Sequence, residues 1–232
     1  MPQKEPLSPP LLAVAATSAA VPAAWAALAA DAVAGGIASS LAGFHWLGLS
    51  LSGAYVVRAD LAADGSHPAV LWTIALVAGP VLSALLALGI HLVVESVRSP
   101  AWLRVLALEM FAFAWLRVPL LLAAGAVHGQ GPVADLYARL GEPEAGRWPV
   151  GLLALLALAA ASAVVAARTV AVGKSWMRVD GRQFRRRISR VLGGYPIVAV
   201  LAGWSVVMPW AAPGWMAAWL LLTLSSLSVL VS

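Results

Sequence analysis

Long apolar runs separated by short polar segments make up most of this chain. Seven such runs are present, over residues 11–30, 32–57, 69–94, 101–127, 149–172, 195–210 and 214–231. About 20 apolar residues in a helix cross a hydrocarbon core of about 30 Å. The sixth run is shorter than that, so its helix is expected to start nearer Val191. The pattern predicts an all-α fold, a polytopic membrane helix bundle of about six or seven transmembrane helices.

Asp31 separates the first two runs. A sharp turn there would give a helical hairpin, whereas one long tilted helix would bury an aspartate among apolar side chains, which is costly. We therefore favour the hairpin and keep the long helix as the alternative. The adjacent pair Gly35 and Gly36 predicts either a close approach of another helix or a late helix start.

A single basic loop, over residues 173–194, interrupts the apolar pattern near the end of the chain. It carries one acid, Asp180, and the basic residues Lys174, Arg178, Arg182, Arg185, Arg186, Arg187 and Arg190. Moving so many Lys and Arg side chains across a bilayer is strongly disfavoured, so we expect this loop to be cytoplasmic. The domain organisation is then a tail over residues 1–10 and one transmembrane domain over residues 11–231 that contains the loop.

Composition agrees with a membrane protein. Hydrophobic residues make up 62% of the chain and charged residues 11%, against about 25% charged in a soluble domain. The net charge of +5 arises mainly in the basic loop. Such a loop meets anionic lipid headgroups, and no nucleic acid is expected as a partner. The absence of cysteine excludes disulfides and thiolate metal sites. We expect an integral protein of a bacterial cytoplasmic membrane.

The charges in the other loops agree with this orientation. With the basic loop inside, the turn over residues 95–104 is also inside, and it carries Arg98 and Arg104. The loops over residues 58–68 and 128–148 then lie outside, where acidic residues offset their arginines. If the chain turns at Asp31, the amino terminus is outside.

Ionisable residues inside apolar runs are the candidate functional groups, because each costs at least ~2.5 kcal/mol at the bilayer centre unless it is paired or hydrated. The candidates are His45, His91, Glu95, Glu109 and Arg117. His45 and His91 lie about 12 Å or more apart in depth by the helical rise, so a haem held by both is not expected.

His91, Glu109 and Arg117 are expected to form a polar clasp between helices, with Glu95 at the water interface. The alternative is a metal site made by His91, Glu95 and Glu109, because residues four apart share a helix face. Gly79 and Pro80 lie inside the third run, where proline removes one backbone hydrogen bond and can break a helix at mid-depth.

Three stretches together resemble the site-2-protease-like family of intramembrane zinc metalloproteases. They are FHWLGLSLSGAYVV (residues 44–57), RADLAADGS after it, and ALVAGPVLSALLALG (residues 75–89). In that family a helix carrying H-E-x-x-H is followed by a short surface strand pair and then by a helix that opens with A-G-P. A short hairpin that includes Tyr55 to Val57 is also consistent with the local pattern.

The metal-binding motif of that family is incomplete in this chain. His45 matches the first histidine, but Trp46 stands at the glutamate and Leu49 at the second histidine. Zinc needs both histidines, and the glutamate acts as general base on the bound water. The resemblance therefore implies a pseudoprotease with no catalytic, metal or cofactor site.

Three functions follow from these observations. The preferred one is a non-catalytic scaffold or accessory subunit that contacts other membrane proteins. The first alternative is a small transporter with a polar site around Glu109, Arg117 and His91. The second alternative is an intramembrane metalloenzyme, which would need a complete ligand set.

Overall fold

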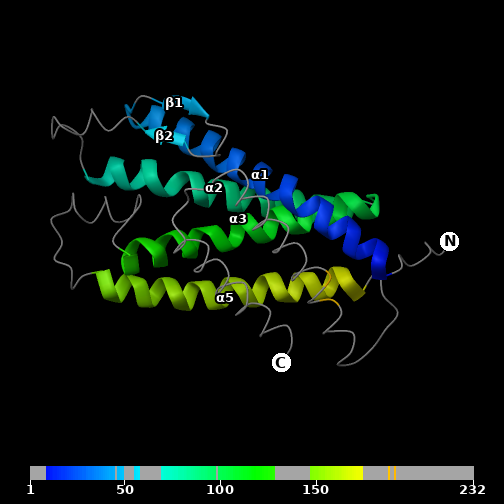
Figure 1. Ribbon diagram of the computed structural model, residues 1–232. Helices are drawn as coiled ribbons and strands as arrows, with labels where there is room; N and C mark the ends of the chain where they lie inside the picture. Colours follow the sequence, from blue (N-terminus) through cyan, green and yellow to red (C-terminus); the bar gives the residue numbers. More distant parts are fainter. Residues whose placement is uncertain are drawn as a thin grey trace. The chain divides into compact units, whose positions relative to one another are not determined.

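Four long helices and one pair of strands make up the part of the chain that the structure describes (Figure 1). The structure, a computed structural model, describes residues 9–44, 46–49, 55–57, 69–97, 99–128, 147–174, 188 and 191. The elements are α1 (Pro9–Leu41), β1 (Trp46–Leu49), β2 (Tyr55–Val57), α2 (Ala69–Ser96), α3 (Ala101–His128) and α5 (Arg147–Lys174).

All four helices are long and apolar enough to cross a membrane. The prediction of a helical membrane protein is confirmed to this extent. The predicted runs over residues 195–210 and 214–231 lie outside the described residues, as does most of the basic loop.

The first two predicted runs do not form a helical hairpin. Helix α1 continues through Asp31 without interruption and has 33 residues, a length of about 50 Å by the helical rise. The predicted turn at Asp31 is therefore wrong, and the long helix is correct. Alanine surrounds Asp31 on both sides, and alanine has the highest helix propensity.

Helix α1 ends in a Schellman motif centred on Gly43. The amide of Phe44 donates to the carbonyl of Ser39, and the amide of Gly43 donates to the carbonyl of Ser40. Gly43 has a φ of 88°, which glycine adopts without a steric penalty. The predicted second span over residues 32–57 is therefore wrong, because its helix ends at Leu41.

The chain after this motif forms a short antiparallel hairpin. Trp46 pairs with Val57 and Leu49 pairs with Tyr55, with an irregular register between the two pairs. The predicted strand at Tyr55 to Val57 is confirmed, but its partner strand precedes it. Trp46 and Leu49, three positions apart in this strand, lie about 10 Å apart along it, so β1 does not have the helical spacing of an H-E-x-x-H motif.

Proline occurs inside three helices without ending them, at Pro22 of α1, Pro80 of α2 and Pro119 of α3. Membrane helices tolerate proline where other groups satisfy the local backbone. Near Pro80, the hydroxyl of Ser83 donates to the Pro80 carbonyl at 2.9 Å. Helix α2 is therefore continuous over Gly79 and Pro80 and is not the broken helix of the transporter alternative.

The chain divides into two compact units, and each of the four helices contributes to both. Unit 1 comprises residues 1–24, 90–112 and 159–232, and unit 2 comprises residues 25–89 and 113–158. The core of unit 1 contains Leu12, Ala16, Val105, Leu108, Val172, Ile188 and Val191. Ile188 packs directly on Gly173, where a side chain would collide with it. Ile188, within the basic loop, thus lies against the end of α5.

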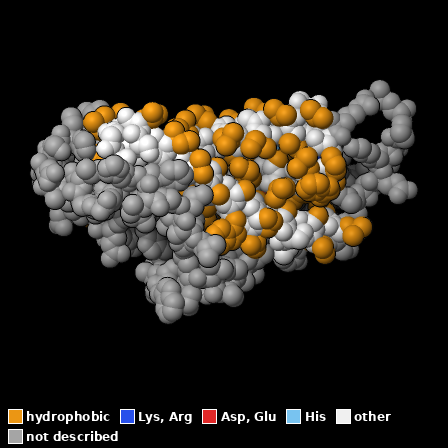
Figure 2. Space-filling model, turned by 90° about the horizontal axis from the view of Figure 1, so that it is seen from above, with side chains coloured by type: hydrophobic (Ala, Val, Ile, Leu, Met, Phe, Trp, Pro, Cys, Tyr) orange, Lys and Arg blue, Asp and Glu red, His pale blue; other side chains and the backbone are white. Residues whose placement is uncertain are grey.

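Large apolar side chains are exposed along the described helices. Figure 2 shows hydrophobic side chains over much of the described surface on one face, and no Lys, Arg, Asp or Glu colour on the described part of that face. Helix α5 alone exposes Leu152, Leu153, Leu155, Leu156 and Val164. A soluble monomer rarely exposes such surfaces, whereas a lipid environment requires them.

Candidate functional site

An ion pair between Asp31 and Arg117 joins two helices of unit 2. Asp31 is in α1 and Arg117 is in α3, and Arg117 Nη2 lies 2.7 Å from Asp31 Oδ2. The exposed fraction of the side chain is 1% for Asp31 and 22% for Arg117. The arginine therefore supplies the counter-charge that permits a carboxylate at this depth.

Arg117 Nη2 and Asp31 Oδ2 are close enough for a charge-assisted contact. Asp31 Oδ1 and Arg117 Nε have no hydrogen-bond partner among the described residues. Buried polar atoms usually have a hydrogen-bond partner. The pair thus offsets charge while leaving acceptor capacity on Asp31 Oδ1 unused.

Gly79 of α2 packs against the same aspartate. A Cβ atom at position 79 would lie 2.6 Å from Asp31 Oδ1, 2.8 Å from the Asp31 carbonyl oxygen and 3.1 Å from Gly35 Cα. Only glycine fits there without displacing its neighbours. The close helix approach predicted at Gly35 is confirmed, and α2 is the helix that approaches.

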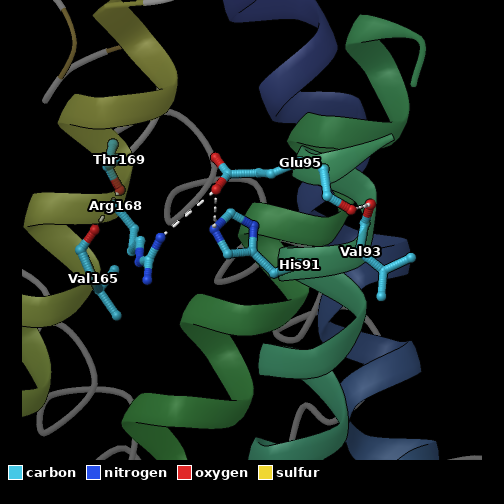
Figure 3. A network of polar contacts seen from close by, with 7 residues as sticks. His91, Val93, Glu95, Val165, Arg168 and Thr169 are labelled. Carbon is cyan, nitrogen blue, oxygen red and sulfur yellow. Dashed lines mark hydrogen bonds and ion pairs between the residues drawn. The ribbon is translucent and has the colours of Figure 1, made fainter. Parts of the chain in front are cut away.

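A second group of charged side chains lies in unit 1, at the carboxyl-terminal end of α2. His91 and Glu95 are one turn apart on α2, and Arg168 comes from α5. Figure 3 shows the imidazole of His91 and the guanidinium of Arg168 both directed at the carboxylate of Glu95. Glu95 Oε2 lies 3.7 Å from His91 Nε2 and 3.7 Å from Arg168 Nη1.

His91 is fully buried, and an aromatic ring holds it in place. The imidazole stacks on the ring of Phe111 from α3, with ring centroids 5.3 Å apart and an interplanar angle of 12°. Both ring nitrogens of His91 lack a hydrogen-bond partner among the described residues. A buried histidine without such partners carries a desolvation cost that packing has to offset.

Glu109 does not form the predicted clasp. It is buried in α3, and its Oε1 has no hydrogen-bond partner among the described residues. Phe111 faces His91, and Glu109 lies two residues earlier, about 200° away around the helix. Glu109 is thus directed away from His91, while Arg117 pairs with Asp31. The predicted partners of Glu109 are therefore wrong.

The described residues contain no group of three His, Cys, Asp or Glu side chains placed to hold a metal ion. The alternative metal site of His91, Glu95 and Glu109 is therefore not formed. His45 lies outside the described residues, as do Arg178, Arg182, Arg185, Arg186, Arg187 and Arg190. Lys174 is the last residue of α5.

Sequence reasoning missed two members of these groups, Asp31 as a paired charge and Arg168 as a partner of Glu95. Arg168 is a charge within an apolar run, the signal by which Glu109 and Arg117 were identified, and it could have been found in the same way. No protein-family model, curated protein or solved structure matches this chain.

Proposed function

We propose that this chain is a non-catalytic polytopic membrane protein that acts as a scaffold or accessory subunit for other membrane proteins. The observation that carries the proposal is the Asp31–Arg117 ion pair packed against Gly79. It involves α1, α2 and α3 within unit 2. A buried charge that contacts both an opposite charge and a neighbouring backbone holds helices in a fixed arrangement.

We further propose that the scaffold is a degenerate site-2-protease-like one. Two features support this part of the proposal. The strand pair β1 and β2 lies between α1 and α2, and the sequence Ala78-Gly79-Pro80 lies inside α2. Trp46 and Leu49 stand where zinc chemistry needs a glutamate and a histidine.

The proposed location is a bacterial cytoplasmic membrane, with the basic loop in the cytoplasm. The basic residues of that loop support this orientation through the positive-inside rule. Because α1 is one helix, alternation of the spans puts the amino terminus on the same side as the basic loop. The two later apolar runs would bring the total to six spans.

The experiment that tests the scaffold function compares two glycine variants of the full chain, purified from native membranes in mild detergent. We expect wild-type protein to form a complex with a second membrane protein in a fixed ratio, measured by native mass spectrometry. Gly79→Ala should reduce the recovered complex, because a Cβ there collides with Asp31. Gly89→Ala is the matched control, since nothing lies within 4 Å of a Cβ at that position.

Two results would reject the scaffold function. One is a chain that migrates only alone or with copies of itself. The other is a Gly79→Ala variant that loses thermal stability while keeping the full amount of complex.

The second candidate function is a small transporter, and one observation favours it. His91 and Glu109 of unit 1 are buried, and polar atoms of both lack partners among the described residues. Such groups in membrane proteins often mark ion or proton pathways. In vesicles that contain the purified protein and a pH-sensitive dye, transport predicts a proton flux that Glu109→Gln abolishes without lowering thermal stability.

A further inference from the structure

One carboxylate oxygen in unit 1 is shared by two nitrogen groups. Glu95 Oε2 lies 3.7 Å from the imidazole of His91 and 3.7 Å from the guanidinium of Arg168. These separations exceed those of direct hydrogen bonds, but charges this close still interact strongly. Arg168 carries its charge permanently, whereas His91 is charged only when protonated.

The imidazole of His91 has a ring nitrogen free to accept a proton, and the ring is held in a fixed position. Neither ring nitrogen has a hydrogen-bond partner among the described residues, and stacking on Phe111 sets the plane of the ring. Glu95 has an exposed fraction of 29%, while His91 is 1% exposed. Water can therefore reach the carboxylate, which lies beside the buried ring.

We propose that His91 and Glu95 form a proton-binding site at the carboxyl-terminal end of α2. A proton from water at Glu95 binds the free nitrogen of the imidazole, and the carboxylate stays ionised as its counter-charge. The net charge of His91, Glu95 and Arg168 then changes from zero to +1. This site goes beyond a scaffold function, since it would let the protein respond to pH at the carboxyl-terminal end of α2.

The charged groups directed at the imidazole come from two helices. Glu95 of α2 favours the protonated form, and Arg168 of α5 opposes it. Helix α3 presents the uncharged ring of Phe111 to His91, and Glu109 is about 200° away around that helix. Arg168 has an exposed fraction of 41%, against 29% for Glu95. Water therefore screens the repulsion between Arg168 and a protonated His91 more than it screens the attraction between Glu95 and a protonated His91.

The test is a titration of His91 by nuclear magnetic resonance in the full chain, labelled with ¹⁵N-histidine and purified in detergent. The chain has four histidines, and the signal missing in His91→Gln identifies His91. We expect this signal to titrate within the pH range over which the protein stays folded. Glu95→Gln and Arg168→Gln should move the midpoint in opposite directions, with the larger movement in Glu95→Gln. His128→Gln, a control at the end of α3, should leave the midpoint unchanged.

The wild-type titration alone decides whether His91 takes up a proton. A His91 signal that stays constant over this pH range would overturn the proposal. So would midpoint shifts of the same sign in Glu95→Gln and Arg168→Gln, because removing an anion and removing a cation must act oppositely on a nearby charge.

Discussion

Gly79 lies so close to Asp31 that a single added methyl group would come within 2.6 Å of the Asp31 carboxylate. The same methyl group would come within 2.8 Å of the Asp31 backbone carbonyl, which cannot rotate away. Asp31 is in turn paired with Arg117. Asp31 and Arg117 form the most deeply buried charged pair among the described residues. Asp31 can keep its position in this pair only if residue 79 has no side chain.

The first prediction is that Gly79→Ala destabilises the protein. Overpacking of this kind costs about 1–3 kcal/mol, and we expect a matching fall in unfolding free energy in detergent. Gly89→Ala is the control, because that position has open space and alanine favours a helix by about 0.5–1 kcal/mol over glycine. Equal stability of the two variants would contradict the close approach at Gly79.

The second prediction concerns the two partners of the ion pair. Arg117→Gln leaves a carboxylate that is 1% exposed, whereas Asp31→Asn leaves a guanidinium that is 22% exposed. Removing one partner of a buried pair costs about 3–5 kcal/mol, and partial hydration should lower that cost for the arginine. We therefore expect Arg117→Gln to lower the unfolding free energy more than Asp31→Asn does.

The double variant, Asp31→Asn with Arg117→Gln, provides the control for the ion pair. It should be more stable than Arg117→Gln alone, because no unpaired charge remains. Additive losses in the double variant would mean that the two side chains do not interact in the folded protein.

Sequence analysis predicted the helices but not how their charged residues pair. The apolar runs indicated α2, α3 and α5 closely, because the length of a span is set by the bilayer. The turn at Asp31 was predicted on the assumption that an aspartate inside a span has no partner. Its partner, Arg117, is 86 positions away in the sequence. One sequence alone does not show which distant residues lie close together in the fold.

The end of α1 could have been predicted from the sequence. Gly43 follows the last helical turn, and glycine after a helix is a common stop signal. The apolar residues after it continued the hydrophobic pattern and concealed that signal. The clasp at Glu109 failed for another reason, since a helical position does not say which neighbouring helix it faces. Which side of α3 faces α2 becomes known only from a contact in the structure, such as the stacking of Phe111 on His91.

The third prediction is topological and uses the absence of cysteine from the chain. Single cysteines at Ser66 and Gly129 should react with an impermeant thiol reagent added outside intact cells, and one at Ser175 should not. In the proposed orientation a cysteine at Lys4 should also be protected, because α1 is one continuous helix. Labelling at position 4 but not at 175 would mean that the chain crosses the membrane twice before residue 58.

The fourth prediction concerns zinc. In the proposed degenerate scaffold, Trp46 and Leu49 stand at two positions where zinc chemistry needs a glutamate and a histidine, and both belong to strand β1. We expect purified protein to hold no stoichiometric zinc that depends on His45. Metal analysis that finds one zinc per chain, lost on His45→Ala, would restore the metalloenzyme alternative.

The last prediction concerns Glu109, which is buried in unit 1 with Oε1 unpartnered among the described residues. A buried polar group without a partner costs about 1–3 kcal/mol, so Glu109→Gln should leave stability unchanged and Glu109→Leu should raise it. The measurement is the unfolding free energy in detergent. Glu95→Leu is the control, because it removes a carboxylate that does have a charged neighbour, Arg168. A loss of stability in Glu109→Leu, partly recovered in Glu109→Gln, would show that Glu109 has a hydrogen-bonding partner in the folded chain. A gain in stability would mean that Glu109 is kept at a cost, as residues with a functional role commonly are.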